Sequence, residues 1–173
     1  QGLKCWGVDV SNEQLRKARS FSEAHGLDLH LRRGDMRHLP FADAAFDYVY
    51  EHYAMCHLSK IDTARAIGEM RRVLNPDGLC FLGLISAETW PPLGQERRPG
   101  EFWLEDEDHA TRHSVFTAEE SDRLIADWKV IRREKIVTES RARMARMTET
   151  DWCELYEEIQ PAGSKDAWMA RYP

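Results

Sequence analysis

The order of secondary structure is decided by residues 3–26, which read LKCWGVDVSNEQLRKARSFSEAHG. Residues 3–10 form a short apolar run, which is typical of a strand. Ser11 follows and is a favoured helix N-cap, with Gln14 placed to complete a capping box. Gly26 is typical of a helix C-terminal stop. The stretch therefore predicts a strand followed by a helix. Three residues mark the face that this helix turns to the core: Leu15, Ala18 and Phe21.

The same alternation continues downstream. Residues 27–31 alternate leucines with polar residues, which predicts a strand that ends at the turn of residues 34–35. Residues 46–50, FDYVY, predict a third strand, and a helix follows it. Residues 75–78, NPDG, predict a turn, and the continuously apolar residues 79–85 predict a strand covered on both faces. The apolar face of the helix is marked by Ile61, Ala64, Ile67, Met70 and Leu74.

Strands and helices that alternate over short connections predict a Rossmann-like, doubly wound α/β fold with a mainly parallel sheet and helices on both faces. A length of 173 residues predicts a single domain over residues 1–173. Residues 86–116 interrupt the alternation of strands and helices and contain several prolines and an acidic run. We interpret this stretch as an irregular insertion of the kind that forms lids.

Weaker patterns follow the insertion. Thr117 and Glu120 predict a second capping box at the start of a short helix. Residues 128–137 predict another strand. Beyond them we expect a short helix over residues 148–159 and an edge strand over residues 168–171. These elements would resume the α/β alternation.

The composition and charge of the chain limit the classes of molecule that it is expected to bind. A net charge of -6 and a pI near 5.7 argue against nucleic acid as a partner and favour a small-molecule substrate. No apolar run approaches the roughly 18 residues that a membrane span needs. The first residues lack the features of a signal or transit peptide, so we expect a cytoplasmic protein without a membrane partner. The sequence leaves the oligomeric state open.

Cysteine and histidine spacing predicts no metal site. The four cysteines are widely spread, without a C-x-x-C pair, and we expect buried thiols. His109 and His113 flank the acidic run, but no predicted strand or helix fixes them, which favours a solvated loop over a metal site. The cysteines are Cys5, Cys56, Cys80 and Cys153.

Acidic residues follow three predicted strands. In an open α/β sheet, ligands bind outside the carboxyl ends of the strands. Asp9 ends the first strand, where a carboxylate can accept hydrogen bonds from both ribose hydroxyls. Asp35 follows the second, where it can accept from an exocyclic amine such as that of adenine, and Glu51 with His52 follows the third. The alternative is structural: Asp9 caps the next helix and Asp35 stabilises its turn. The pair favours an adenosine site.

Several short motifs stand in a fixed order along residues 2–86: Gly7-Val8-Asp9-Val10-Ser11, Gly34-Asp35-Met36, Leu39-Pro40-Phe41, Phe46-Asp47-Tyr48-Val49, His57-Leu58 and Leu74-Asn75-Pro76-Asp77-Gly78. Together they resemble the small-molecule branch of class I S-adenosylmethionine-dependent methyltransferases. A weaker similarity runs from residue 116 to residue 136. The resemblance implies an enzyme that transfers a methyl group from S-adenosylmethionine to a small acceptor, which the sequence does not identify.

The resemblance also implies a cofactor site made of Asp9, Val10, Asp35, Met36 and Glu51. Asp9 would bind the ribose hydroxyls. Asp35 and the backbone of Met36 would contact the adenine edge, and Glu51 would lie near the methionine end of the cofactor.

One family feature is missing from the sequence. The family has a glycine-rich loop after its first strand, yet no two glycines here stand one residue apart. We therefore expect the chain to begin at the second strand of the family fold and to be N-terminally incomplete. The absent strand would lie in the middle of the sheet, so its two neighbours would have unpaired backbone groups.

Candidate catalytic residues cluster after the third strand. A sulfonium methyl is an activated electrophile, so the protein needs mainly to align it and, for some acceptors, to supply a general base. His57, His52 and Tyr53 are the candidates, although His57 can equally pack against neighbouring loops. Trp90 and Trp103 are candidates to face the sulfonium or a planar acceptor, because aromatic faces attract cations. Such rings also commonly belong to the core.

Two other functions remain open at this point. A nicotinamide-dependent oxidoreductase also uses an acid at the end of its second strand. A non-catalytic subunit could keep the methyltransferase fold and serve as a binding partner.

Overall fold

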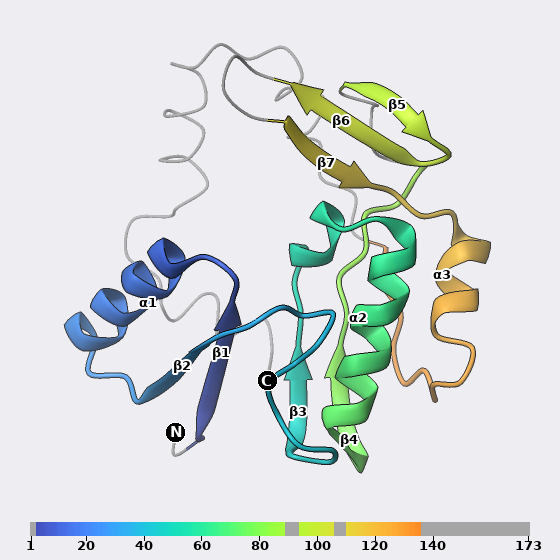
Figure 1. The fold of residues 1–173 in the computed structure, drawn as a ribbon. Helices are drawn as coiled ribbons and strands as arrows, with labels where there is room; N and C mark the ends of the chain where they lie inside the picture. The colour runs from blue at the N-terminus through green and yellow to red at the C-terminus, as the bar shows by residue number, and fades with distance from the viewer. Residues whose placement is uncertain (1–2, 89–93, 106–109, 136–173) are drawn as a thin grey trace. The chain divides into compact units, whose positions relative to one another are not determined.

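The computed structural model describes residues 3–88, 94–105 and 110–135 (Figure 1). The chain divides into two units, Gln1–Ile131 and Arg132–Pro173. In the second unit the described residues are 132–135, where the Arg132 guanidinium binds the Glu134 carboxylate at 3.0 Å from Nε. The helix and strand predicted beyond residue 147 lie outside the described residues. The prediction of one domain stays a prediction.

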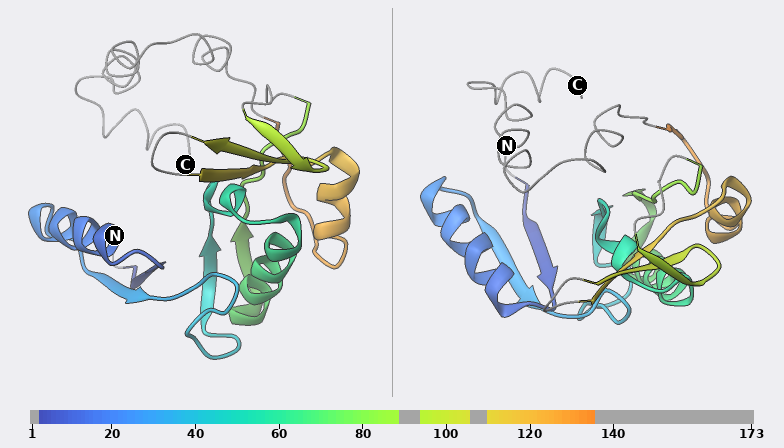
Figure 2. Two further views of the ribbon diagram at one scale, coloured as in Figure 1. Left: turned by 45° about the horizontal axis from the view of Figure 1, so that its top comes forward. Right: turned by 90° about the horizontal axis from the view of Figure 1, so that it is seen from above.

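The first strand, helix and strand form as predicted. They are β1 (Cys5–Asp9), α1 (Asn12–Ala24) and β2 (Leu29–Arg33). β1 and β2 pair in parallel over their whole length, and they lie side by side in Figure 1 and in both views of Figure 2. Parallel pairing through a helix is the βαβ unit that the α/β pattern predicts.

Helix α1 begins and ends where the sequence predicts. Ser11 is its N-cap, and the Ser11 Oγ accepts a hydrogen bond of 3.3 Å from the backbone N–H of Gln14, which is half of the predicted capping box. Gly26 follows the helix with a φ of 62°, a left-handed conformation that glycine adopts without strain. These local signals are therefore enough to fix the helix ends.

The predicted helix faces are partly wrong. In α1, Leu15 is buried, but Phe21 is 56% exposed and stacks on His25 with ring centroids 4.0 Å apart. In α2 (Lys60–Val73), Ile61 is 63% exposed because the buried face is centred on the other side of the helix. Residues of this face recur every three or four positions, as an amphipathic helix requires. They are Thr63, Ala66, Ile67, Met70 and Val73.

A second parallel pair consists of β3 (Phe46–Tyr50) and β4 (Leu74–Phe81), joined by the short 3-10 helix η1 (Ala54–His57) and α2. β3 was predicted correctly. The predicted turn over residues 75–78 instead belongs to β4, which begins at Leu74 rather than residue 79. The register shifts there, so that these residues form a bulge opposite β3.

The four parallel strands form two separate two-stranded sheets, β1-β2 and β3-β4. Within the described residues, β1 pairs only with β2, and β3 only with β4. Among the described strands, β1 and β3 are therefore not paired with each other. The absence of a central strand stays a prediction.

The described residues 95–105 and 110–114 are not irregular, contrary to the sequence analysis. They form an antiparallel sheet of β5 (Gln95–Arg98), β6 (Glu101–Glu105) and β7 (Ala110–Ser114), which Figure 2 shows in two views. Charged residues on these short strands hid the pattern from a search for apolar runs. Gly100 forms the turn between β5 and β6 with a φ of 72°.

The last described helix is α3 (Ala118–Leu124), and its capping box between Thr117 and Glu120 is formed as predicted. The strand predicted over residues 128–137 is wrong for its described part, because residues 128–135 join no described strand. Instead, Trp128 packs against the core beside α2, while Ile131 is 74% exposed. A strand needs a neighbour to complete its hydrogen bonds.

Candidate functional site

The carboxyl ends of β1 and β2 meet at one edge, because the two strands are parallel. The backbone N–H of Gly34 donates to the carbonyl of Asp9 at 3.1 Å, which extends the pairing beyond β2. The chain then turns back over residues 35–38, where the N–H of His38 donates to the carbonyl of Asp35 at 2.9 Å. Asp9 and Asp35 therefore lie at the same edge, as the sequence predicts.

Asp9 has a structural role in this edge. Its Oδ1 accepts a hydrogen bond of 2.7 Å from the backbone N–H of Ser11, the N-cap of α1. Within the described residues, no hydrogen bond is formed to Oδ2. The local turn thus fixes the orientation of the half-buried carboxylate and leaves one oxygen to accept hydrogen bonds from a ligand.

Asp35 is held by Arg37. The backbone N–H of Arg37 donates to Oδ1 at 2.8 Å, and its guanidinium donates to Oδ2 from Nη2 at 2.6 Å. These bonds from Arg37 lower the pKa of Asp35, so the carboxyl stays ionised at neutral pH. A purine amine would have to share this carboxylate with the guanidinium. The other two predicted contacts differ in exposure, since Met36 is half-buried against the core and Val10 is 60% exposed.

Two residues of α2 that the sequence analysis missed hold the loop after β2. Glu69 accepts a hydrogen bond of 2.7 Å from the backbone N–H of Leu39, and Arg72 donates to the carbonyl of Leu39 at 3.0 Å. Arg72 also binds Glu69 at 2.7 Å, and this contact lowers the pKa of Glu69. The available signal was an acid and a base three residues apart on one helix.

Glu51 is buried at the carboxyl end of β3, with 5% of its surface exposed. Its Oε1 accepts a hydrogen bond of 2.9 Å from the backbone N–H of Met55, and its Oε2 accepts one of 3.2 Å from the N–H of Gly83. The carboxylate therefore joins the end of β3 to η1 and to the segment after β4. Both oxygens already have backbone partners.

The three candidate catalytic residues divide into two groups. The rings of His52 and Tyr53 are in contact, with centroids 4.2 Å apart. His57 lies at the end of η1, where its Nδ1 is 3.2 Å from the carbonyl oxygen of Arg112 in β7. Because a carbonyl only accepts, Nδ1 must carry the proton, and the lone pair of neutral His57 is then on Nε2. His57 also contacts the ring of His113, with centroids 4.9 Å apart.

The candidate lid tryptophan Trp103 lies in β6, and two cations already cover its ring. The guanidinium carbons of Arg97 and Arg112 are 5.4 Å and 4.7 Å from the ring centroid. A sulfonium would compete with these groups for the same aromatic faces. Trp90 lies outside the described residues.

Two expectations about cysteine and histidine need correction. Cys5 is exposed, whereas Cys56 is buried as expected. Burial raises the pKa of the half-buried Cys80 thiol to about 12, which disfavours the nucleophilic thiolate at neutral pH. His113 does not lie on a solvated loop but in β7, and burial lowers its pKa, as does the nearby His57. His109 lies outside the described residues.

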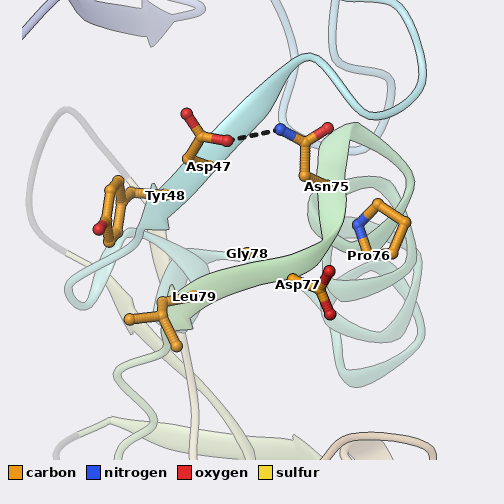
Figure 3. Close-up of a pocket in the computed structure, with 7 residues that line it drawn as sticks. All are labelled: Asp47, Tyr48, Asn75, Pro76, Asp77, Gly78 and Leu79. Carbon is orange, nitrogen blue, oxygen red and sulfur yellow. Dashed lines mark hydrogen bonds between the residues drawn. The ribbon is translucent and has the colours of Figure 1, made fainter.

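A hollow on the surface lies away from the carboxyl ends of the parallel strands, where the candidate site residues lie. Figure 3 shows it at the start of β3 and within the bulge of β4, where the Asn75 amide donates to Asp47 Oδ1 at 2.6 Å. Glu51 follows the other end of β3. The hollow thus reflects the shape of the bulge and is not the predicted cofactor site.

Parallel βαβ pairing is typical of a Rossmann-like fold, and acids follow the carboxyl ends of its strands. Comparisons with known proteins show a more specific similarity. Residues 1–78, less than half of the chain, match the family described as "Methyltransferase domain". Over these residues the chain is similar to methyltransferases.

Two sequence relatives and one solved structure are similar to this chain, the solved structure in its fold alone. An uncharacterized methyltransferase, YcgJ of Bacillus subtilis, is 37% identical over 80 residues, which cover 46% of this chain and 31% of YcgJ. A demethylmenaquinone methyltransferase of Staphylococcus haemolyticus is 34% identical over 89 residues, covering 51% of this chain and 36% of the relative. A SAM-dependent methyltransferase structure from Methanosarcina mazei matches with a TM-score of 0.60 and 19% identity, over 78% of this chain and 74% of that one.

The chain covers about a third of the length of these two sequence relatives. The comparisons do not favour a nicotinamide-dependent oxidoreductase or a non-catalytic subunit. Among the described helices, none is both long enough and apolar enough to cross a membrane.

Proposed function

We propose that this chain is part of an enzyme that transfers a methyl group from S-adenosylmethionine to a small-molecule acceptor. The observation that carries the proposal is Asp9, an oriented carboxylate at the carboxyl end of β1, inside the segment that matches the methyltransferase family. Fold alone would be weaker support, because one fold can host many reactions.

The residues at this edge fit an adenosine group. Asp9 offers Oδ2 to ribose hydroxyls, while its other oxygen is held by Ser11. Asp35 offers an ionised carboxylate beside Met36, whose backbone would meet the adenine edge. Glu51 organises the neighbouring strand ends through its backbone contacts rather than through an oxygen left for the cofactor.

The cofactor supplies an activated methyl group on a sulfonium. The protein then needs to hold the acceptor in line and exclude water. His52 and Tyr53 lie together after β3, where one of them could take a proton from the acceptor. His57 lies instead against β7 and is the weaker candidate for this step.

A small-molecule acceptor is supported by the acidic net charge and by the demethylmenaquinone methyltransferase among the relatives. The acceptor's identity is not part of the proposal. A cytoplasmic location, predicted from the sequence, stays a prediction.

The test is calorimetric titration of S-adenosylmethionine into the full chain and into Asp9→Ala. Loss of the ribose contacts should weaken binding by about 1–3 kcal/mol, which is roughly 5–150-fold. Asp28→Ala is the matched control, since the Asp28 side chain is 87% exposed before β2. Equal affinity of Asp9→Ala and the unchanged chain would remove Asp9 from the site.

A further inference from the structure

Three potential metal ligands converge where η1 meets β7. Cys56, His57 and His113 each offer one ligand atom, and these atoms all lie within 4.8 Å of one another. Cys56 is buried, His113 is half-buried and His57 is exposed. The two segments are far apart in the sequence, so the fold, and not local spacing, assembles the cluster.

Hydrogen bonds from side chains to backbone carbonyls hold the two segments together. The Ser114 hydroxyl donates to the carbonyl of Leu58 at 2.5 Å, beside the contact of His57 with Arg112 at 3.2 Å. Cys56 also packs in a core cluster with Ile85 and Val115. The cluster therefore rests on packed elements, as a binding site with defined geometry requires.

The hydrogen bond of His57 prepares it to bind a metal. Histidines that bind metals commonly donate their second ring N–H to a backbone carbonyl, which fixes the tautomer and the ring orientation. Arg112 provides such a carbonyl for Nδ1 of His57 and leaves the lone pair on Nε2.

The donor set favours zinc. One thiolate and two imidazoles form a borderline-soft set, and zinc sites that exchange a ligand commonly have three protein ligands and an open fourth position. Donor atoms around tetrahedral zinc are about 3.3–3.6 Å apart. The present separations, up to 4.8 Å, need a contraction of up to about 1.2–1.5 Å, and the exposed His57 side chain can supply much of it.

We propose that Cys56, His57 and His113 bind one zinc ion, with a fourth position open to water or another ligand. Binding displaces the proton of the Cys56 thiol, which donates to the carbonyl of Tyr53 at 2.8 Å when no metal is bound. The site is independent of the proposed methyl transfer. It makes His57 a ligand rather than a general base.

The first test is a zinc titration of the chelator-treated full chain against a competing chromophoric chelator. We expect one zinc per chain. Cys56→Ser and His113→Ala should each weaken binding by more than the roughly 10–100-fold that loss of a second-shell partner costs. Cys80→Ser and His25→Ala should bind zinc as the unchanged chain does. Absence of saturable binding, or equal binding by Cys56→Ser, would overturn the proposal.

Cobalt provides a signature that does not depend on affinity. The cobalt-loaded chain should show the intense visible bands of a tetrahedral site and a thiolate charge-transfer band in the near ultraviolet. The His25→Ala spectrum should be identical. A spectrum without the thiolate band would show that Cys56 is not a ligand and would overturn the site.

Because Cys56 packs in a core cluster, its replacement can also affect folding, and two measurements avoid this problem. His57→Ala changes an exposed side chain and should weaken zinc binding while circular dichroism stays unchanged. In the unchanged chain, zinc should slow alkylation of Cys56, read by mass spectrometry, and leave alkylation of the exposed Cys5 unaffected. Unchanged zinc affinity in His57→Ala, or equal alkylation of Cys56 with and without zinc, would count against the site.

Discussion

Glu51→Ala should destabilise the domain strongly although it removes no apolar packing. The side chain is 5% exposed and accepts hydrogen bonds from two buried backbone groups, the N–H of Met55 at 2.9 Å and that of Gly83 at 3.2 Å. Its removal leaves both N–H groups without this acceptor, at about 1–3 kcal/mol each. Allowing for partial relaxation and water entry, we expect a loss of about 2–4 kcal/mol in the free energy of unfolding.

Urea unfolding followed by circular dichroism measures this loss. Glu51→Gln keeps one carbonyl acceptor but turns an amide N–H₂ towards the second backbone donor, so its stability should fall between those of Glu51→Ala and the unchanged chain. Glu13→Ala is the control, since Glu13 is 63% exposed and its pair with Lys17 should contribute under about 0.5 kcal/mol. If Glu51→Ala lies within about 0.5 kcal/mol of the unchanged chain, the assignment of Glu51 as the link between strand ends is wrong.

Three further predictions follow from the same structure. The folded-state pKa of Glu69 is lowered, so its contribution to stability is complete above its unfolded-state pKa of about 4.3 and is lost as the pH falls through the folded-state pKa. The stability–pH curves of Glu69→Gln and the unchanged chain should therefore converge as the pH falls through the folded-state pKa of Glu69. Gly100→Ala should destabilise the domain by about 1–3 kcal/mol, because φ is 72° and the added Cβ would lie 2.8 Å from the carbonyl oxygen of Val115. Gly68→Ala in α2 should instead stabilise the domain by about 0.5–1 kcal/mol, because a Cβ there meets no atom within 4 Å. Thermal melts measure both effects. If the insertion of residues 86–116 acts as a lid, amide exchange in β5–β7 should slow when cofactor and acceptor are both bound. Equal exchange with and without them would reject the lid.

Local signals predicted the helix ends and the parallel strands well. Ser11 and Thr117 cap helices in the structure because capping depends on residues three positions apart. The bulge in β4 could not be predicted in this way. Asn75-Pro76-Asp77-Gly78 has turn chemistry, yet in the structure β4 pairs with β3 on both sides of these residues, and Asn75 donates to Asp47 of β3. Contacts with the neighbouring strand therefore decide that these residues form a bulge in β4 rather than a turn before it.

The candidate site was predicted less completely, because it too depends on contacts between residues that are far apart in the sequence. Asp9, Asp35 and Glu51 were selected because they follow strands, and the pairing of β1 with β2 confirms that the first two share an edge. Their hydrogen-bond partners depend on the folded chain. The contact of Glu51 with Gly83 spans 32 residues, and no spacing rule indicates it.

The two readings of Asp9, a cap for the next turn and a ligand for ribose, are compatible in the structure. Ser11 occupies Oδ1 and leaves Oδ2, so the same bond that stabilises the turn also fixes the direction of the second oxygen. A carboxylate oriented before binding loses less conformational entropy when a ligand arrives. Asp35 differs, because Arg37 contacts both of its oxygens. A ligand at this edge therefore gains more from Asp9 than from Asp35, and replacing Asp9 should cost more affinity than replacing Asp35.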